Sequence, residues 1–276
     1  MSQISMMANG LSKFVLTDDN YYSNEADWQY MSTSQYKSFK QCEASALAEL
    51  KKEWEPSSDP KALLVGNYVH TYFESEKAHE AFKEENKEKM FSSRKPYGLL
   101  KDFQIAEQMI ERLKQEAVFS EIYQGEKETI VTGKIFDVDW KGKIDCLNMN
   151  DQYFVDIKTT KDMHERKWNE NYGSRETFIV NFGYALQMAI YQELLFQQYG
   201  KQFHPLIAAV SKQTPSEARL ITIDEDKMAY EMVLLKEKIE RIVKVKNGEE
   251  KPHACGICEY CRGNNRITGF TSMDDL

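Results

Sequence analysis

Hydrophobic residues recur at helical intervals in the first 120 residues of the chain. Ser32, with Gln35 three positions later, matches a capping box, and apolar residues then follow every three or four positions until Glu55–Pro60, where two prolines and two serines predict the helix end. The same spacing predicts helices over about 61–80 and 100–118. The charged segment between them, 83–95, predicts a solvated loop or helix end.

The spacing then changes to that of β-strands. Four short β-prone runs separated by turn residues, Gly133, Lys141-Gly142 and Asn150-Asp151, predict an antiparallel meander. The runs are 128–132, 134–140, 143–149 and 152–159. A helix over 182–199, strands over 206–211 and 219–223, and a long helix over about 224–245 are predicted after them. This order predicts an α/β domain over residues 31–276, in which helices flank a central sheet, preceded by an irregular N-terminal arm over residues 1–30.

Composition narrows the class of protein. The 276 residues are 41% hydrophobic and 29% charged, which excludes collagen-like, low-complexity and mostly disordered chains. No apolar run approaches the roughly 20 residues that span a bilayer, and Met1–Gly10 lacks a signal-peptide pattern, so we expect a cytoplasmic protein without a membrane partner. The net charge of −8 argues against a protein that coats nucleic acid by broad electrostatic attraction.

The meander carries an acidic constellation. Two strands joined by a tight turn place Asp145 and Asp156 near the same end of adjacent strands, and strand alternation directs Lys158 to the same face. Carboxylates bind hard cations such as Mg²⁺ or Mn²⁺, and a lysine can orient water or offset charge on a phosphate. The alternative is a half-buried hairpin with a solvated polar face, because Asp-x-Lys alone is common.

Four-residue steps on two predicted helices add candidates. Gly66 and His70 share one face of the second helix, and Glu74 lies one turn further. Gln187 and Tyr191 repeat the step on the helix after the meander. The alternatives are a packed or surface histidine and an ordinary helix-packing pair.

Along the chain these motifs read Gly-x-x-x-His, Gly-x-x-Asp, Asp-x-Lys-Thr and Gln-x-x-x-Tyr. Their order resembles the RecB-like branch of the PD-(D/E)XK nuclease superfamily, and most closely the RecE-like exonucleases of phages and prophages, over about Ser32 to Cys261. The resemblance implies a restriction-endonuclease-like core, with a central mixed sheet and an antiparallel meander flanked by helices. It also implies a Mg²⁺-dependent DNA exonuclease that hydrolyses phosphodiester bonds at linear duplex ends, in phage recombination beside a single-strand annealing protein.

The resemblance also implies roles for individual residues. The implied metal ligands are His70, Asp145, Asp156 and the carbonyl of Ile157. Lys158 matches the catalytic lysine, Gln187 and Tyr191 match the helix motif beside the active site and DNA, and Glu74 is a candidate supporting group. An aspartate instead of a glutamate at the second acidic position is usual in this branch. Relatives form rings around DNA, so a homo-oligomer fits the resemblance, although no interface can be identified in the sequence.

Three of the five cysteines lie within seven residues, at CxxCxxC spacing. An odd number of cysteines in a chain expected in the cytoplasm argues against a disulfide framework. The three are Cys255, Cys258 and Cys261, and Cys42 is the candidate fourth ligand. Four thiolates suit a [4Fe–4S] cluster or structural zinc. One N-terminal and three C-terminal cysteines resemble the iron–sulfur subset of RecB-like nucleases, which favours the cluster over zinc or free thiols.

Two further residues and one group of basic residues complete the candidates. His253 is an alternative metal ligand, and Cys146 is predicted to point away from Asp145 into the core. Basic residues after the active strand predict salt-sensitive DNA contact confined to one channel, or a solvated helix. They are Lys158, Lys161, Arg166, Lys167 and Arg175.

Two other functions fit the same residues. One is a catalytically silent DNA-binding or metal-stapled interaction module, and the other is a structure-specific endonuclease or single-strand exonuclease. The complete set of three metal ligands and a lysine argues against a silent site.

Overall fold

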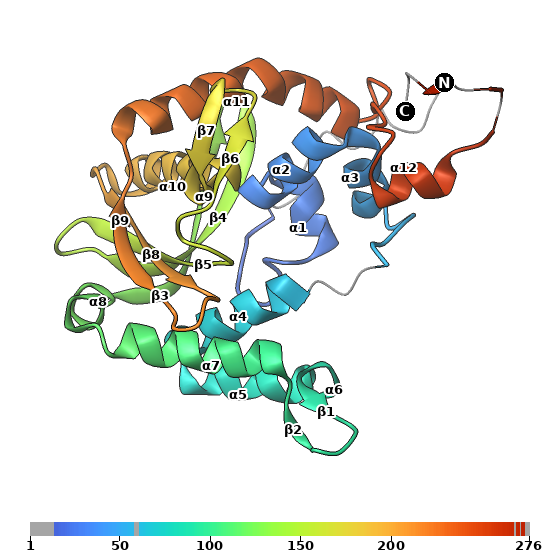
Figure 1. Ribbon diagram of the computed structural model, residues 1–276. Helices are drawn as coiled ribbons and strands as arrows, with labels where there is room; N and C mark the ends of the chain where they lie inside the picture. The colour runs from blue at the N-terminus through green and yellow to red at the C-terminus, as the bar shows by residue number, and fades with distance from the viewer. Residues whose placement is uncertain (1–13, 58–60, 268, 271, 274–276) are drawn as a thin grey trace.

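A five-stranded mixed sheet lies at the centre of the protein (Figure 1). The computed structural model describes residues 14–57, 61–267, 269–270 and 272–273, so residues 1–13 of the expected arm and residues 58–60 of the predicted helix end lie outside the described part. The sheet order is β3 (Glu126–Ile135), β4 (Val138–Asn148), β5 (Tyr153–Thr160), β8 (His204–Ser211) and β9 (Ala218–Thr222). β5 and β8 are parallel and the other neighbours antiparallel, which confirms the predicted mixed sheet with its meander.

Helices cover both faces of the sheet. On one face, α10 (Tyr184–Tyr199) packs against β3 and β4 and is covered by α11 (Glu225–Lys246), beside α2 (Thr33–Gln41) and α3 (Glu43–Leu50). On the other face lie α4 (Lys61–Glu74), α7 (Lys101–Lys114) and α8 (Ala117–Ile122). The remaining helices are α1 (Asn24–Gln29), α5 (Glu76–Glu85), α6 (Lys87–Met90), α9 (Phe178–Asn181) and α12 (Glu259–Asn264). No helix in the described part is long and apolar enough to span a bilayer.

The predicted meander has one strand too many, because two glycines were interpreted as turns. β3 and β4 are continuous through Gly133 and Gly142, and their only turn is at Phe136-Asp137, where both φ angles are positive (50° and 62°). A Cβ on Gly142 would lie 2.6 Å from the Tyr191 ring, and one on Gly133 would meet side chains of α10. These glycines therefore permit close packing of α10 on the sheet.

Other differences arise from helix ends and from small elements. The helix predicted over 61–80 is divided at Ser75, whose hydroxyl caps α5 by accepting from the Ala78 N–H at 3.1 Å. The segment 83–95 is mostly structured: it contains the end of α5, α6 and β1 (Phe91–Ser92), which pairs with β2 (Gly98–Leu99). Ser32 caps α2 as predicted, at 3.1 Å from the Gln35 N–H.

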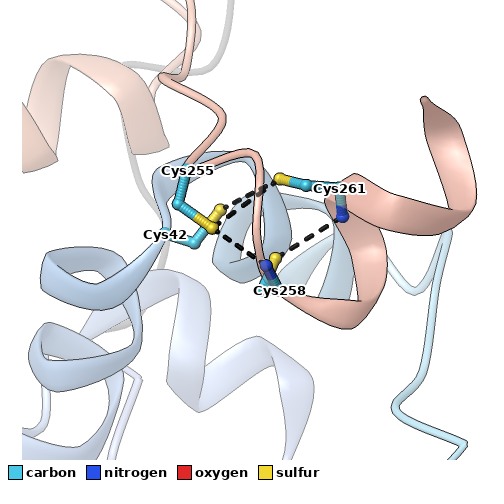
Figure 2. Close-up of side chains that lie close together, drawn as sticks. All are labelled: Cys42, Cys255, Cys258 and Cys261. Atoms are coloured by element: carbon cyan, nitrogen blue, oxygen red, sulfur yellow. Dashed lines mark hydrogen bonds between the residues drawn. The ribbon is translucent and has the colours of Figure 1, made fainter. Parts of the chain in front are cut away.

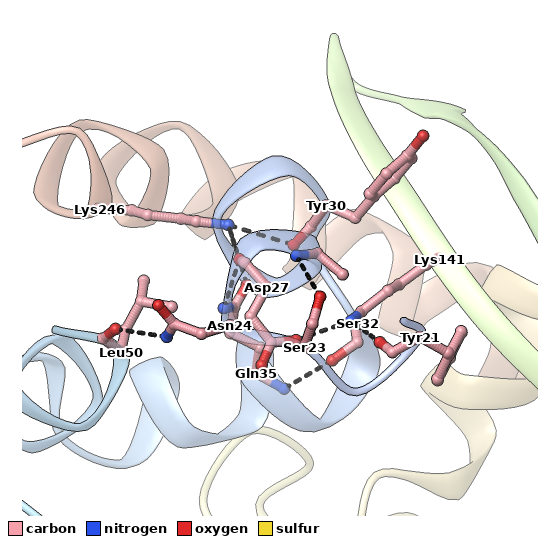
Figure 3. A network of polar contacts seen from close by, with 11 residues as sticks. Tyr21, Ser23, Asn24, Asp27, Tyr30, Ser32, Gln35, Leu50, Lys141 and Lys246 are labelled. Carbon is pink, nitrogen blue, oxygen red and sulfur yellow. Dashed lines mark hydrogen bonds and ion pairs between the residues drawn. The ribbon is translucent and has the colours of Figure 1, made fainter. Parts of the chain in front are cut away.

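Two buried lysines attach the N-terminal segment to the core (Figure 3). Lys141 Nζ donates to the Tyr21 carbonyl at 2.6 Å and to the Asp27 carboxylate at 2.7 Å. Lys246 Nζ donates to the Asp27 carbonyl at 2.6 Å and the Tyr30 carbonyl at 3.2 Å. These contacts order residues for which the sequence indicated no regular structure, including α1.

Candidate active site and cysteine cluster

The two candidate carboxylates lie where β4 and β5 separate. The ladder between these strands ends at the pair Cys146–Val155, and the next pair in the same register is Asp145 opposite Asp156. Residues opposite each other in an antiparallel pair point to one face of the sheet. Cys146 points to the other face, in the core beneath α4 and α7, as predicted.

Asp145 links the split strand to α4. Its Oδ2 accepts a hydrogen bond from the Ile157 N–H at 2.7 Å and lies 3.1 Å from His70 Nδ1. The residue is only 7% exposed. The Asp145 carboxylate therefore replaces the backbone carbonyl that would otherwise accept the hydrogen bond of the Ile157 N–H. His70, on α4, holds this carboxylate in place.

Asp156 is held from α10 and by its own strand. Its Oδ1 accepts a hydrogen bond from Gln187 Nε2 at 3.0 Å, and the same amide nitrogen lies 3.1 Å from the Tyr191 hydroxyl. Its Oδ2 contacts Lys158 Nζ and has no other polar partner among the described residues. Lys158 Nζ lies 4.8 Å from the centre of the Tyr184 ring. The structure thus brings the predicted lysine, glutamine and tyrosine to one aspartate that is 1% exposed.

The two carboxylates differ in charge state. Burial raises the pKa of Asp156 to about 6, and the positive charge of Lys158 opposes this only in part. Burial also acts on Asp145, but the charge and hydrogen bond of His70 outweigh it and lower its pKa. Burial alone would lower the pKa of Lys158, but the negative charges of Asp156 and Asp145 outweigh burial, so the pKa of Lys158 lies above its ordinary value. One ionised carboxylate therefore lies beside one that takes up a proton near neutral pH, with a permanently charged lysine.

Glu128 extends the acidic row, and no sequence motif indicates it. The ladder between β3 and β4 omits one pair, Glu128 opposite Asp145, and Glu128 has a positive φ of 53°. Burial, followed by the charge of Asp145, raises the pKa of Glu128 to about 7. Lys143 Nζ lies 3.4 Å from its carboxylate. A left-handed backbone at a non-glycine residue is strained, and such strain is enriched at functional sites.

Lys37 is a second residue that sequence analysis missed. It reaches the site from α2, donates from Nζ to the Phe182 carbonyl at 3.2 Å, and lies 5.5 Å from the centre of the Tyr184 ring that Lys158 also approaches. Burial, together with the charge of Lys158, lowers its pKa to about 8. The helical pattern marked the neighbours of Lys37 as core and gave the lysine no role.

The donor atoms suit a hard divalent cation. Two carboxylates and a main-chain carbonyl at Ile157 are oxygen ligands of the kind that Mg²⁺ and Mn²⁺ prefer. Asp156 Oδ2 is buried with a single ammonium as its partner, so it retains lone pairs for a metal. Asp145 and Asp156 would hold such an ion, with His70 beside them.

The basic residues at the end of β5 and after it are only partly gathered at the site. Lys158 lies within it and Lys161 is exposed just beyond the strand. The other three lie on a hairpin of β6 (Arg166–Asn169) and β7 (Ser174–Thr177), where a solvated helix was the alternative prediction. That alternative is wrong, because the segment forms strands.

The four predicted cysteines form a second cluster, which joins the junction of α2 and α3 to the start of α12 (Figure 2). Their sulfur atoms all lie within 4.8 Å of one another, with 3.6 Å between Cys42 and Cys261 and 3.9 Å between Cys255 and Cys261. Cys42 has an extended backbone and separates α2 from α3, which sequence analysis treated as one helix. Four sulfurs so placed can hold a metal ion.

Backbone N–H groups prepare this cluster for a metal. The Cys258 N–H donates to Cys255 Sγ at 3.3 Å and the Cys261 N–H to Cys258 Sγ at 3.5 Å. The hydrogen bonds from the N–H groups of Cys258 and Ile257 lower the pKa of Cys255 to about 6, whereas burial raises the pKa of Cys261 to about 12. The lowered pKa makes Cys255 a thiolate at neutral pH, which is the form in which cysteine binds a metal.

Glu43 connects α3 to α11 and to the segment that follows α11. Its carboxylate accepts two hydrogen bonds from Arg241 at 2.8 Å and one from the His253 N–H at 2.8 Å. The His253 carbonyl in turn accepts from the Ala44 N–H at 3.0 Å. His253 acts here through its backbone, and the group of four ligand atoms consists of cysteines, without the predicted histidine alternative.

Comparisons with known proteins agree with this architecture. A family model described as "PDDEXK-like domain of unknown function (DUF3799)" matches residues 32–264. The crystal structure of a "putative exonuclease" from Eubacterium rectale is similar with a TM-score of 0.87 and 34% identity, over 95% of this chain and 98% of that chain. The crystal structure of SSO0001 has a TM-score of only 0.32 and 15% identity, over 71% of this chain and 81% of that chain, which is too low to indicate a shared fold. No curated protein matches the chain.

Proposed function

We propose that the chain, which belongs to the family of PDDEXK-like domains DUF3799, is a metal-dependent DNA exonuclease. The nuclease fold of this family is the fold class that the sequence predicts. It hydrolyses phosphodiester bonds at DNA ends, with Mg²⁺ or Mn²⁺ as the cofactor. The observation that carries this proposal is the strand split, where Asp145 and Asp156 face each other and Lys158 contacts Asp156.

Each residue of the site has a physical task in this reaction. A bound divalent ion neutralises charge on the phosphoryl oxygens and lowers the pKa of water. Asp145 and Asp156 would hold the ion, with the Ile157 carbonyl and His70 as further ligands, and His70 also orients the Asp145 carboxylate, 3.1 Å from its Nδ1. Lys158 remains positively charged, so it positions the attacking water and stabilises the negative charge that develops on phosphate.

Two residues of α10 act through Asp156. Gln187 donates to one carboxylate oxygen, which leaves the other oxygen for Lys158 and the metal. Tyr191, next to the Gln187 amide, fixes the orientation of that amide. Precise orientation matters because misplacement of a ligand by about 1 Å can cost roughly a hundredfold in rate.

Exonuclease activity, as opposed to another nuclease activity, is supported by the RecE-like motif order and by the description of the similar E. rectale protein. The same resemblance supports a cytoplasmic role in phage or prophage recombination, with a single-strand annealing protein as partner and a ring-shaped homo-oligomer on DNA. A catalytically silent DNA-binding or interaction module and a structure-specific endonuclease are the competing functions.

A substrate panel separates these functions. Linear, nicked, circular and single-stranded DNA are incubated with the protein in Mg²⁺, with and without EDTA. We expect rapid loss of linear duplex in Mg²⁺ alone. Cleavage of closed circles would indicate an endonuclease, and binding without cleavage of any substrate would indicate a silent module.

The site assignment is tested with Lys158→Ala and Asp145→Ala. We expect both variants to lose Mg²⁺-dependent degradation of linear duplex DNA by about 10³-fold, with unfolding temperatures near that of the wild type. Lys201→Ala is the matched control, because this lysine is exposed and lies outside both the acidic site and the basic residues predicted to contact DNA. Wild-type rates in both site variants would show that the site is elsewhere.

We also propose that the cysteine cluster holds one structural zinc ion. A tetrahedral zinc site with Zn–S bonds of about 2.3 Å separates its sulfurs by about 3.8 Å, close to the 3.6 and 3.9 Å between Cys261 and its two neighbours. In a [4Fe–4S] cluster each cysteine binds a different iron, so the sulfurs lie farther apart. Elemental analysis with one zinc per chain supports this, whereas iron with absorbance near 400 nm supports the cluster that the sequence pattern favoured.

A further inference from the structure

The β6–β7 hairpin exposes a tryptophan to solvent. Trp168 is 57% exposed, whereas Trp140 is fully buried in the main core. Its indole makes no ring or cation contact with the described residues. Single exposed apolar residues are common, so exposure alone assigns no function.

Two arginines flank Trp168 on the same face of the hairpin. Arg175 is its direct cross-strand partner, and Arg166 lies two residues earlier on β6. Both residues are exposed, and neither side chain forms a hydrogen bond or ion pair with the described part of the chain. The acidic neighbours are occupied: Glu165 pairs with Lys167 and Glu176 with Lys227. The charges of Arg166 and Glu176 interact, but Glu176 is paired with Lys227, so the Arg-Trp-Arg face keeps positive charge and is complementary to an anion that carries aromatic rings.

The hairpin is held rigidly from its other face and its tip. Asn181 of α9 donates to the Glu176 carbonyl at 2.7 Å and bonds with the Asn169 amide at 3.0 Å. At the tip, Tyr172 donates to the Glu231 carboxylate at 3.1 Å and its ring packs against Tyr230 of α11. Figure 1 shows the hairpin against α9 and α11. The exposed face is therefore presented in a fixed orientation.

Both ends of the hairpin lead directly to the candidate active site. Five residues separate the end of β5, which carries Lys158, from β6, and α9 with Phe182 and Gly183 separates β7 from Tyr184. A DNA strand whose phosphate lies at Lys158 and Tyr184 would therefore contact two segments of the chain that continue directly into the hairpin. Bases stack on exposed aromatic rings without regard to sequence, and arginines bind the adjacent phosphates.

From these observations we propose that Arg166, Trp168 and Arg175 form a binding surface for unpaired nucleotides of the DNA strand that enters or leaves the active site. This inference rests on the proposed nuclease function, since it needs a nucleic acid at the site. It assigns the hairpin to the single strand, with Trp168 stacking on a base and the arginines on phosphates.

The test measures binding and hydrolysis separately. Binding of a fluorescent single-stranded oligonucleotide, a tailed duplex and a blunt duplex is measured in the Lys158→Ala background, so that DNA is not degraded. We expect Trp168→Ala to weaken binding of the single strand and the tailed duplex about 10-fold, and Trp168→Phe to restore it to within about 3-fold. The double variant Arg166→Ala/Arg175→Ala should lower the slope of log affinity against log salt by about 1.4, at about 0.7 per phosphate.

Matched controls are Trp28→Ala and Arg94→Ala, which remove an exposed tryptophan and an exposed arginine outside the hairpin. Hydrolysis of the small diester bis(p-nitrophenyl) phosphate, measured with Lys158 intact, should be unchanged in the hairpin variants because the diester is too small to reach the hairpin. Equal binding by wild-type and hairpin variants, or equal loss on the blunt duplex, would overturn the inference while leaving nuclease activity in place. Stronger binding of the same sequence as RNA would also overturn it. Absence of hydrolysis in the wild type would instead refute the proposed function.

Discussion

The acidic site and the cysteine cluster gather metal-binding side chains in opposite ways. Asp145 and the backbone of Ile157 are 12 residues apart and meet through the register of one hairpin, whereas Cys42 and Cys261 are 219 residues apart. The acidic site offers hard oxygen donors inside the sheet, already engaged by His70, Lys158 and Gln187. The cysteine cluster offers soft sulfur donors where the segment after α11 meets α2 and α3.

This difference indicates two separate tasks. Oxygen ligands that share their lone pairs with cationic side chains suit an ion that binds with substrate and leaves with product. Four thiolates that face one another form a closed set with no position for substrate, which is typical of a structural metal. Catalysis and chain closure should therefore be separable by mutation.

The largest expected effect is that of Asp145→Asn, which breaks one side of the comparison. The amide oxygen can still accept the Ile157 N–H, so the strand split persists, but the charge that holds the cation is lost. We expect kcat/KM on linear duplex DNA to fall by about 10³-fold or more, with little change in unfolding temperature and unchanged metal at the cysteines. Activity within tenfold of the wild type would remove Asp145 from the ligand set.

Cys42→Ala breaks the other side. It should remove the metal from the cysteine cluster and release the chain end from α2 and α3, lowering the unfolding temperature by at least about 5 °C. Activity at 20 °C should change only a few-fold, because no cysteine of the cluster contacts the acidic site. Cys146→Ala is the matched control: it removes a buried thiol and costs stability without loss of metal, as measured by elemental analysis. Parallel loss of metal in both variants would contradict the assignment.

The acidic site and the cysteine cluster also differ in how much of each can be predicted from the sequence. The tight turn between the strands brings Asp145 to Asp156, and strand alternation puts Lys158 on the same face, because hairpin register is a local property. The position where the ladder opens is not local, since it depends on α4 delivering His70 and on α10 delivering Gln187. Motif spacing identifies three of the four cysteines, and the family resemblance adds Cys42, but neither predicts the break of the first helix at Cys42 or the short distances between the sulfurs.

Glu128 and Lys37 show what sequence patterns cannot reveal. Glu128 joins the acidic row because the ladder omits its pair and its φ is positive, neither of which has a signature in a run of β-prone residues. Lys37 lies on a helix whose apolar pattern indicates only a core face. Gly133 and Gly142 resemble turn residues in sequence, and only the packing of α10 shows why they are glycine.

Lys37→Met should reduce DNA degradation by an intermediate factor, about 10-fold to 100-fold, and so separates substrate binding from metal binding within the acidic site. Its ammonium is close to Lys158 and Tyr184 and forms no direct ion pair with a described carboxylate, although the charge of Asp156 acts on it, so it is available to a substrate phosphate. Because the pKa of Lys37 is lowered to about 8, the ammonium is lost as pH rises above 8, and wild-type activity should decline there. Lys37→Arg should extend activity to higher pH, as measured by kcat/KM from pH 7 to 10. A wild-type decline that Lys37→Arg leaves unchanged would contradict this role.

The smallest expected effect concerns the stability of the metal-free protein. The pKa of Glu128 is raised from its ordinary value of 4.5 to about 7, mainly by burial and then by Asp145, so the folded state keeps a proton that the unfolded state releases. Its stabilising contribution is complete below pH 4.5 and is lost as pH rises to about 7. Glu128→Gln should therefore raise the unfolding temperature in EDTA by a few degrees at pH 8 and leave it unchanged at pH 4.5. Glu126→Gln, on an exposed residue of the same strand, is the control and should show no such pH dependence. If Glu128→Gln raised the unfolding temperature equally at both pH values, the carboxylate row would not be what destabilises the metal-free site.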